Sequence, residues 1–76
     1  MSQGYSLKLR DLNRRAPSTL LGVRLGRACI KNDIPASRVA DEMGVSRQTV
    51  YNWFRGASQP NDGLTVRIER FISALS

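Results

Sequence analysis

The sequence predicts an all-α fold, a compact bundle of four or five short helices that contains a tight helical corner and carries a basic N-terminal arm. Three observations support this class. Apolar residues recur at spacings of three and four from residue 18 onward, Gly and Pro separate the periodic segments, and no segment alternates as a clear strand. The 76 residues, 41% of them apolar, suffice for one small globular domain. We therefore expect an arm at residues 1–17 and a folded domain at residues 18–76.

The first 17 residues are polar and basic, and periodicity alone does not decide their structure. Leu7 and Leu9 fit a short strand, whereas Leu9 and Leu12 fit one face of a short helix. We favour a loosely held arm with a helical turn that ends at Pro17. Residues 1–31 hold seven basic side chains and one acid, so they carry the whole net charge of +6. This block favours a polyanion, nucleic acid before anionic membrane, over a solvated tail that only aids solubility.

The first helix of the domain is expected to follow Ser18, a suitable N-cap, and to stop at Asn32. Gly22 and Gly26 lie four residues apart inside it, and each weakens a helix by up to ~1 kcal/mol relative to alanine. We therefore expect these glycines to allow close packing against a neighbour. The inward face of this helix consists of Leu20, Leu21, Leu25, Ala28 and Cys29.

Two helices of about eight residues, joined by Gly-Val-Ser, form the helical corner. The first has Pro35 in its first turn and runs to Met43, and Gly44 then ends it, because proline suits a first helical turn and glycine accepts the positive φ that ends a helix. The second is capped by Ser46, runs from residue 47 to about 55, and closes at Gly56. Such a corner is the helix-turn-helix of DNA-binding proteins, whose second helix enters the major groove.

The interior of this corner requires small and apolar residues at fixed places. A small residue is needed at position 40, because the second helix crosses there at close range. Trp53 among basic residues suggests base stacking, yet its spacing from the turn favours a place in the core. The motif core is Ala40, Gly44, Val45, Val50 and Trp53.

The last segment reads as a loop over residues 57–63, with Pro60, followed by one more helix. Its apolar residues recur at spacings of three and four and form a continuous stripe, typical of a helix packed on a core. The stripe consists of Leu64, Ile68, Phe71, Ile72 and Leu75.

The run ASRVADEMGVSRQTVYNWFRG resembles the helix-turn-helix of the lambda-repressor/Cro (XRE-type) family, strongly over residues 34–56. The likeness includes the V-A-D-x-M-G run and the aromatic Phe54 followed by x-Gly. A weaker likeness extends to one helix before the motif and one or two after it. The arm at residues 1–17 has no counterpart, and we expect no separate dimerisation or effector domain. The resemblance implies that the residues just after the cap of the second helix point into the groove.

By that resemblance Arg47 and Gln48 carry most of the base readout. Their chemistry agrees, because Arg pairs with guanine O6 and N7 and Gln with adenine N6 and N7. Asn52 would read a base or hold a phosphate, and Tyr51 and Thr49 would touch a thymine methyl, with a phosphate as a further partner for Tyr51. For each of these residues the alternative is plain solvation of a polar helix face.

Phosphate contacts are expected from the edges of this footprint and from the basic arm. Arg38 has an alternative, an ion pair with Asp41 or Glu42 on its own helix. The expected phosphate-contacting residues are Ser37, Arg38, Ser46, Arg55, Lys8, Arg10, Arg14 and Arg15.

The composition argues against several other classes. A single cysteine and no histidine exclude disulfide frameworks and Cys/His zinc sites within one chain, so we expect no metal and no cofactor. The sequence has no evident pair of catalytic carboxylates and no evident phosphate-cradling loop, so we do not expect an enzyme. Nothing in it indicates a small-molecule ligand. There is no membrane-length apolar run and no signal-peptide core. We therefore expect a cytoplasmic protein, in a bacterial host if the chain is phage-derived.

The function expected from the sequence is a sequence-specific regulator of transcription that binds double-stranded DNA, a repressor of the phage or mobile-element kind. One reading helix covers only about four or five base pairs, so a homodimer on a two-fold-related operator is expected. Phe71, Ile72 and Leu75 are the candidate dimer surface. The alternatives are a DNA-architectural, recombination-accessory or packaging-type recognition module, and a protein-interaction domain that kept only the fold.

Overall fold

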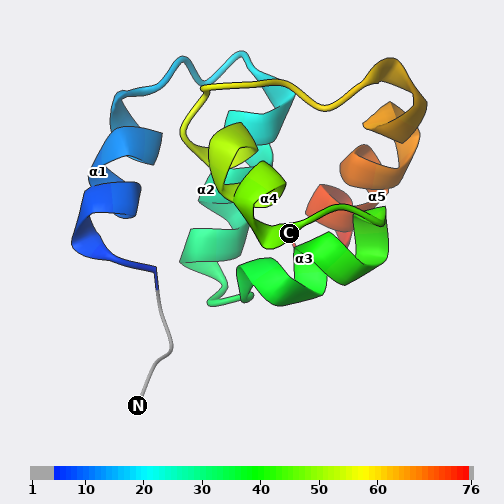
Figure 1. Cartoon of the computed structure of the whole chain (residues 1–76), viewed down its shortest axis with the longest axis horizontal. Coiled ribbons are helices and arrows are strands. Elements are labelled where there is room, and N and C mark those ends of the chain that lie inside the picture. The colour runs from blue at the N-terminus through cyan, green and yellow to red at the C-terminus, as the bar shows by residue number, and fades with distance from the viewer. Residues whose placement is uncertain (1–4, 76) are drawn as a thin grey trace.

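The computed structural model describes residues 5–75, which form five α-helices, one 3-10 turn and no strand (Figure 1). Helix α2 lies at the centre and packs against α1, α4 and α5, while α3 packs against α4. The predicted all-α class is confirmed. The elements are α1 (Leu7–Arg15), α2 (Leu21–Lys31), α3 (Ala36–Met43), α4 (Arg47–Phe54), η1 (Asp62–Leu64) and α5 (Thr65–Leu75).

The core lies where α2 meets the helical corner and α5. Its fully buried side chains include Leu25 from α2, Val39 from α3, Val50 and Phe54 from α4, and Ile68 from α5. The rest of the apolar stripe on α5 is half-buried and packs against this cluster. Apolar side chains from four helices therefore hold the corner on a common support.

The two glycines of α2 lie where α1 and α4 approach it most closely. A Cβ added at Gly22 would come within 2.8 Å of the Trp53 Cβ, and one added at Gly26 within 2.7 Å of the Asn13 Nδ2. A Cβ atom essentially never makes contacts this short, so both positions require glycine at this helix spacing. The expectation that these glycines allow close packing is confirmed.

Most helix ends lie at the residues that the sequence predicted. Gly44 ends α3 with φ 70, Ser46 caps α4, Gly56 follows α4 with φ 80, and Asn32 ends α2. The prediction that Ser18 is the N-cap of α2 was wrong. The N-cap is Leu20, whose side chain makes no capping hydrogen bond. The physical reason is a turn over residues 17–20, closed by the Leu20 N–H donating to the Pro17 carbonyl, which delays the helix.

Residues 7–15 form a packed helix in place of the loosely held arm that the sequence favoured. Ser6 caps α1 by accepting a hydrogen bond from the Leu9 N–H at 3.1 Å. Asn13 is only 3% exposed and packs against α2 and α4. At the end of α1, the Arg27 guanidinium donates to the carbonyls of residues 13, 14 and 16 at 3.3, 3.1 and 3.1 Å. Polar contacts therefore anchor α1, and a search for apolar periodicity does not detect them.

Candidate nucleic-acid interface

Helix α4 has two chemically different sides. Val50, Trp53 and Phe54 are buried, and none of them is more than 3% exposed. The opposite side carries two arginines, two carboxamides, one phenol and no acid, so nothing on it repels a polyanion. Its residues are Arg47, Gln48 and Arg55, which are exposed, and Tyr51 and Asn52, which are half-buried. This is the face that the sequence indicated.

The turn before α4 is built from its own backbone and cap. Gly44 takes the left-handed conformation, which is disfavoured for residues with a Cβ. The space where a Cβ would lie is open, so the backbone conformation and not crowding favours glycine here. The Ser46 Oγ accepts from the Thr49 N–H at 3.1 Å and lies 2.9 Å from the Thr49 Oγ1. Ser46 and Thr49 are therefore hydrogen-bonded to each other at the start of the helix, whereas the side chains of Arg47 and Gln48 are exposed.

The polar side of α4 is linked along its length through Asn52. The Asn52 Oδ1 accepts a hydrogen bond from the Gln48 Nε2 at 3.2 Å and one from the Arg55 guanidinium at 3.1 Å. These residues are one helical turn apart, which is the spacing at which side chains on one face meet. The structure thus brings together two predicted readers, Gln48 and Asn52, and one predicted phosphate contact, Arg55.

Tyr51, another predicted reader, contacts Tyr5 in the segment before α1 and is otherwise partly exposed. The ring of Tyr5 meets it edge to face with centroids 6.4 Å apart, and also meets Phe54 at 5.6 Å. The Tyr5 hydroxyl donates to the Ile34 carbonyl before α3, and burial raises the pKa of this hydroxyl. Tyr5 therefore joins the start of α1, the α2–α3 turn and α4.

A cleft of about 520 Å³ opens beside the start of α4. It unites Ser37, a predicted phosphate contact at the start of α3, with the predicted readers Arg47 and Tyr51. Polar and apolar groups contribute about equally to its surface, which suits a polar ligand that also makes van der Waals contact. Its lining consists of Tyr5, Ser6, Leu9, Pro35, Ala36, Ser37, Arg47 and Tyr51.

The C-terminal end of α4 is fixed as firmly as its start. The last four carbonyls of a helix lack partners within it. In α4 the carbonyls of residues 51–53 accept N–H groups from the following turn at 3.1, 2.9 and 3.1 Å. The remaining carbonyl, that of Phe54, accepts from the Asn13 Nδ2 at 2.6 Å, and the same nitrogen donates to the Val23 carbonyl at 3.2 Å. A side chain from α1 therefore satisfies the last carbonyl of α4.

Asn13, Tyr5 and Arg27 were missed by the sequence reasoning. Asn13 and Tyr5 lie in the segment that reads as polar and basic, whereas Arg27 lies in α2. Each contacts residues more than ten positions away along the chain, and the contact between Asn13 and Phe54 spans 41 positions. No local pattern marks them. The signal that was available is Gly26, whose lack of a side chain leaves room for Asn13 and Phe54.

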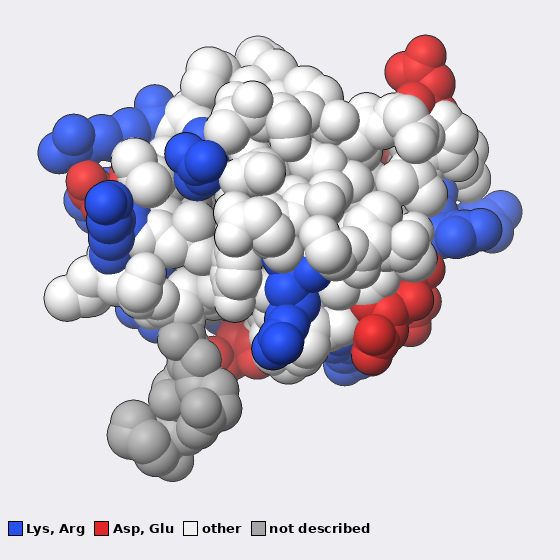
Figure 2. All heavy atoms as spheres, in the orientation of Figure 1, with Lys and Arg blue, Asp and Glu red and all other residues white. Residues whose placement is uncertain are grey.

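The predicted phosphate contacts on α3 lie in its first turn, and its two acids, Asp41 and Glu42, lie in its last turn. Ser37 and Arg38 are both exposed. Within residues 5–75 Arg38 forms no ion pair with Asp41 or Glu42, the alternative role considered for it. Figure 2 shows one group of acidic residues at the lower right, on the side of α3, and another at the upper right, whereas several Lys and Arg residues lie at the left, over α1.

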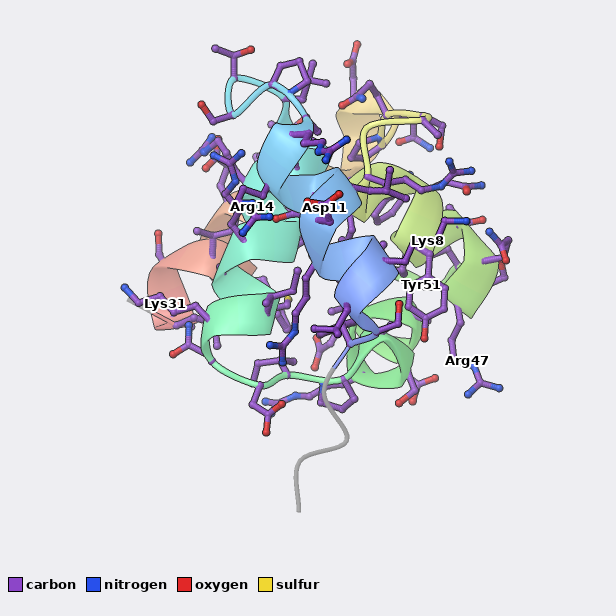
Figure 3. The ribbon with its side chains drawn as sticks, turned by 90° about the vertical axis from the view of Figure 1, so that its left-hand side faces the viewer. Lys8, Asp11, Arg14, Lys31, Arg47 and Tyr51 are labelled. Carbon is purple, nitrogen blue, oxygen red and sulfur yellow. The ribbon has the colours of Figure 1, made fainter. Side chains whose placement is uncertain are left out.

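The four predicted contacts on α1, which are Lys8, Arg10, Arg14 and Arg15, are all exposed. Asp11 pairs with Arg14 at 2.8 Å and with Arg15 at 3.2 Å. In Figure 3, Lys8 lies on the side of Tyr51 and α4, whereas Arg14 lies on the opposite side, toward α2. Lys31 projects at the far end of α2, well away from Arg47. Only part of the basic block is therefore near the polar side of α4.

Two residues with alternative chemical roles belong to the core. Trp53 is 3% exposed and fills the wedge, so it is not placed to stack on a base. Cys29 is fully buried, and burial raises the pKa of its thiol to about 12. Residues 5–75 contain no cluster of His, Cys, Asp and Glu arranged to hold a metal ion. None of the helices described is long and apolar enough to cross a membrane.

Comparison with known proteins gives one match. A family model described as helix-turn-helix matches residues 25–73, from the middle of α2 to near the end of α5. Helix α1 lies wholly outside this match. No curated protein and no solved structure matches the chain.

Proposed function

Because the chain belongs to the XRE-type helix-turn-helix family, whose members are DNA-binding regulators of transcription, we propose that it is a sequence-specific repressor that binds a two-fold-related operator as a homodimer. The observation that carries the proposal is the acid-free face of α4, which stands on a fully buried apolar side. A face of this kind fits the major groove, whose base edges offer hydrogen-bond donors and acceptors.

In this proposal the base contacts come from the exposed residues of α4. Arg47 and Gln48 reach furthest, and Asn52 orients Gln48 through their hydrogen bond. Tyr51 has a smaller part in readout, since its ring also packs on Tyr5. Thr49 contributes through its methyl group, because its N–H and hydroxyl are engaged with the cap.

Phosphate contacts frame the bases that are read. Ser37 lines the cleft beside Arg47, and a phosphate seated there would meet the start of α3, where Pro35 provides no side-chain cap for the free N–H groups. Arg38 is exposed on the same first turn. Ser46 and Arg55 flank the two ends of α4. Contacts of this kind fix the register of a protein on the duplex and carry no sequence information of their own.

The homodimer is proposed through the outward face of α5. Phe71, Ile72 and Leu75, the surface expected from the sequence, are half-buried against the core and offer only part of their area. The outward face includes Val66, which is 62% exposed. A shallow, mainly apolar hollow runs along this face, lined by Thr65, Val66, Glu69, Arg70, Ser73 and Ala74.

Selection of bound sequences from a random duplex pool tests the function. We expect an inverted repeat to be enriched, and a promoter that carries this repeat to be repressed by the protein. A single or degenerate site would favour an architectural, recombination-accessory or packaging role. No enrichment, or activation of the promoter, would contradict the proposal.

Light scattering of the purified protein tests the dimer. Val66→Glu should yield a monomer with weakened operator binding, because it places a charge in an apolar interface. Leu7→Glu is the matched control, since Leu7 is 82% exposed on α1. We expect that variant to remain a dimer. Equal behaviour of the two variants would exclude α5 as the interface.

A further inference from the structure

Helix α1 lies outside the residues matched by the family model, yet it is attached to the reading helix at two points. Tyr5 packs against Tyr51 and Phe54 just before α1 begins. Asn13, near the other end of α1, donates to the Phe54 carbonyl. The orientation of α1 relative to the bases read by α4 is therefore fixed.

The cations of α1 fall on two flanks of the helix. Lys8 and Arg15 are seven residues apart, two helical turns, and so share one flank. Arg10 and Arg14 are four residues apart and share the other. Figure 3 shows which flank faces α4, because Lys8 lies on the side of Tyr51 and Arg14 lies on the opposite side.

The ion pairs of Asp11 do not withdraw these cations from a stronger anion. Arg14 and Arg15 pair with Asp11, yet their side chains remain 80% and 76% exposed. Exposed pairs of this kind typically contribute little free energy. A DNA phosphate, which also releases condensed counterions when it is neutralised, competes well with one half-buried carboxylate that is shared between two arginines.

We propose that the flank of α1 formed by Lys8 and Arg15 is a second DNA contact, which grips the phosphate backbone beside the bases read by α4. The two residues are separated by ~10 Å along the helix, comparable to roughly three base steps of ~3.4 Å on one strand. This inference rests on the proposed function. It extends the footprint beyond the base pairs that the helix-turn-helix itself covers.

The test compares two double variants that remove the same charge from the same helix. Lys8→Gln with Arg15→Gln removes the proposed flank, and Arg10→Gln with Arg14→Gln removes the opposite one. Each pair deletes two exposed cations and one partner of Asp11. The affinity of each protein for the selected duplex is measured from 50 to 300 mM salt, and thermal melting confirms that both variants are folded.

We expect the slope of log K against log salt to become shallower by ~3.6 for the Lys8/Arg15 variant, because the proposed homodimer loses four phosphate contacts and each lost contact removes ~0.9. The Arg10/Arg14 variant should change the slope by less than ~0.5, since only long-range attraction is lost. Both changes should be the same on selected and scrambled duplexes, because phosphates carry no sequence.

A second measurement locates the contact on the DNA. Methylphosphonate linkages, which are uncharged, replace three phosphates beyond each end of the selected site. They should weaken wild-type binding and leave the Lys8/Arg15 variant almost unaffected, because its partners are already lost. Additive losses would overturn the proposal.

Equal slope changes in the two double variants, or none in either, would also overturn it. So would loss of binding to phosphatidylserine vesicles in the Lys8/Arg15 variant with DNA binding unchanged. In each of these cases the wild-type protein still selects a sequence, so only the contact through α1 fails. A wild-type protein that selects no sequence would instead overturn the proposed function and this inference with it.

Discussion

Asn52 is the residue around which the exposed side of α4 is organised. Its side-chain oxygen accepts from both Gln48 and Arg55, so these side chains are held in place before any ligand arrives. Preorganised donors lose less conformational entropy on binding than free ones. Arg47 has no part in this network and keeps the freedom to adopt a bidentate geometry with a base.

Replacing Arg47 with alanine should weaken binding to the selected duplex by ~1–3 kcal/mol for each half-site and relax the preference at one base pair of each half-site. Binding to a scrambled duplex should change far less. Fluorescence anisotropy on the two duplexes measures both effects. Arg67→Ala, which removes an exposed arginine from α5, is the control and should leave base preference intact. Equal losses on both duplexes would show that Arg47 contacts a phosphate.

Cys29 makes stability depend on pH in the alkaline range. Its thiol has a pKa of about 12 in the folded state, because burial disfavours the thiolate, against an ordinary value of 9.0. A pKa raised by folding stabilises the protein fully below the unfolded value, and this contribution is lost as pH rises toward the folded one. Stability should therefore fall above pH 9, by at most ~1.4 kcal/mol per pH unit from this group.

Urea unfolding between pH 7 and pH 10 measures this loss. Cys29→Ala removes the titrating group, and its unfolding free energy should decline less steeply above pH 9. Part of the decline should remain, because burial also raises the pKa of Tyr5. Identical pH profiles for the two proteins would contradict the prediction.

At the scale of elements, the helical corner and α1 depend on different kinds of interaction. The corner is specified locally, by Gly44 in the left-handed conformation and by Ser46 at the cap of α4. The α4 face follows from helical periodicity, which separates buried Val50 from exposed Arg47. These features could be predicted because each depends on residues within one or two turns.

The docking of α1 could not be predicted, for a physical reason. Its anchors are single polar groups that satisfy carbonyls of other helices, such as Asn13 on Phe54 and Arg27 on the end of α1. Such a group leaves no periodic trace in the sequence. Its partner becomes evident only when the chain is folded, and the same holds for Tyr5, whose hydroxyl donates to the Ile34 carbonyl.

Asn13→Ala should destabilise the fold by ~1–3 kcal/mol, because it leaves the Phe54 carbonyl buried without its donor. Asn32→Ala is the matched control. The Asn32 side chain also donates to a backbone carbonyl, that of Ala28 at 2.8 Å, but it is exposed and water can replace it. Asn32→Ala should change the free energy of unfolding by no more than ~0.5 kcal/mol. Chemical denaturation measures both, and equal losses would mean that the bridge from α1 contributes nothing specific.

At the scale of the whole molecule, a small core is combined with an uneven charge distribution. The N-terminal 31 residues hold the entire net charge, yet the structure spreads these cations over several directions, with Lys31 far from Arg47. Net charge alone therefore overstates the DNA-binding surface. The positions of single cations relative to α4 decide which of them meet the duplex.

A bound operator should stabilise so small a domain strongly. At a free duplex concentration of 100 times Kd, linkage adds ~2.7 kcal/mol, which for a domain of this size corresponds to a rise in Tm of roughly 10–20 °C. A scrambled duplex at the same concentration should raise Tm by only a few degrees in 150 mM salt. Differential scanning fluorimetry provides the measurement, and equal shifts would indicate binding without sequence preference.

The hydrogen bond between Asn13 and the Phe54 carbonyl has a consequence for anyone who wishes to transplant this reading helix. A domain shortened to residues 25–73, which the family model matches, would expose the surface that α1 covers. It would also remove the hydrogen-bond donor of the Phe54 carbonyl at the end of α4. A portable version of the module therefore starts no later than Tyr5. The exposed residues of α4 can then be substituted for a new DNA sequence, while its buried residues Val50, Trp53 and Phe54 are kept.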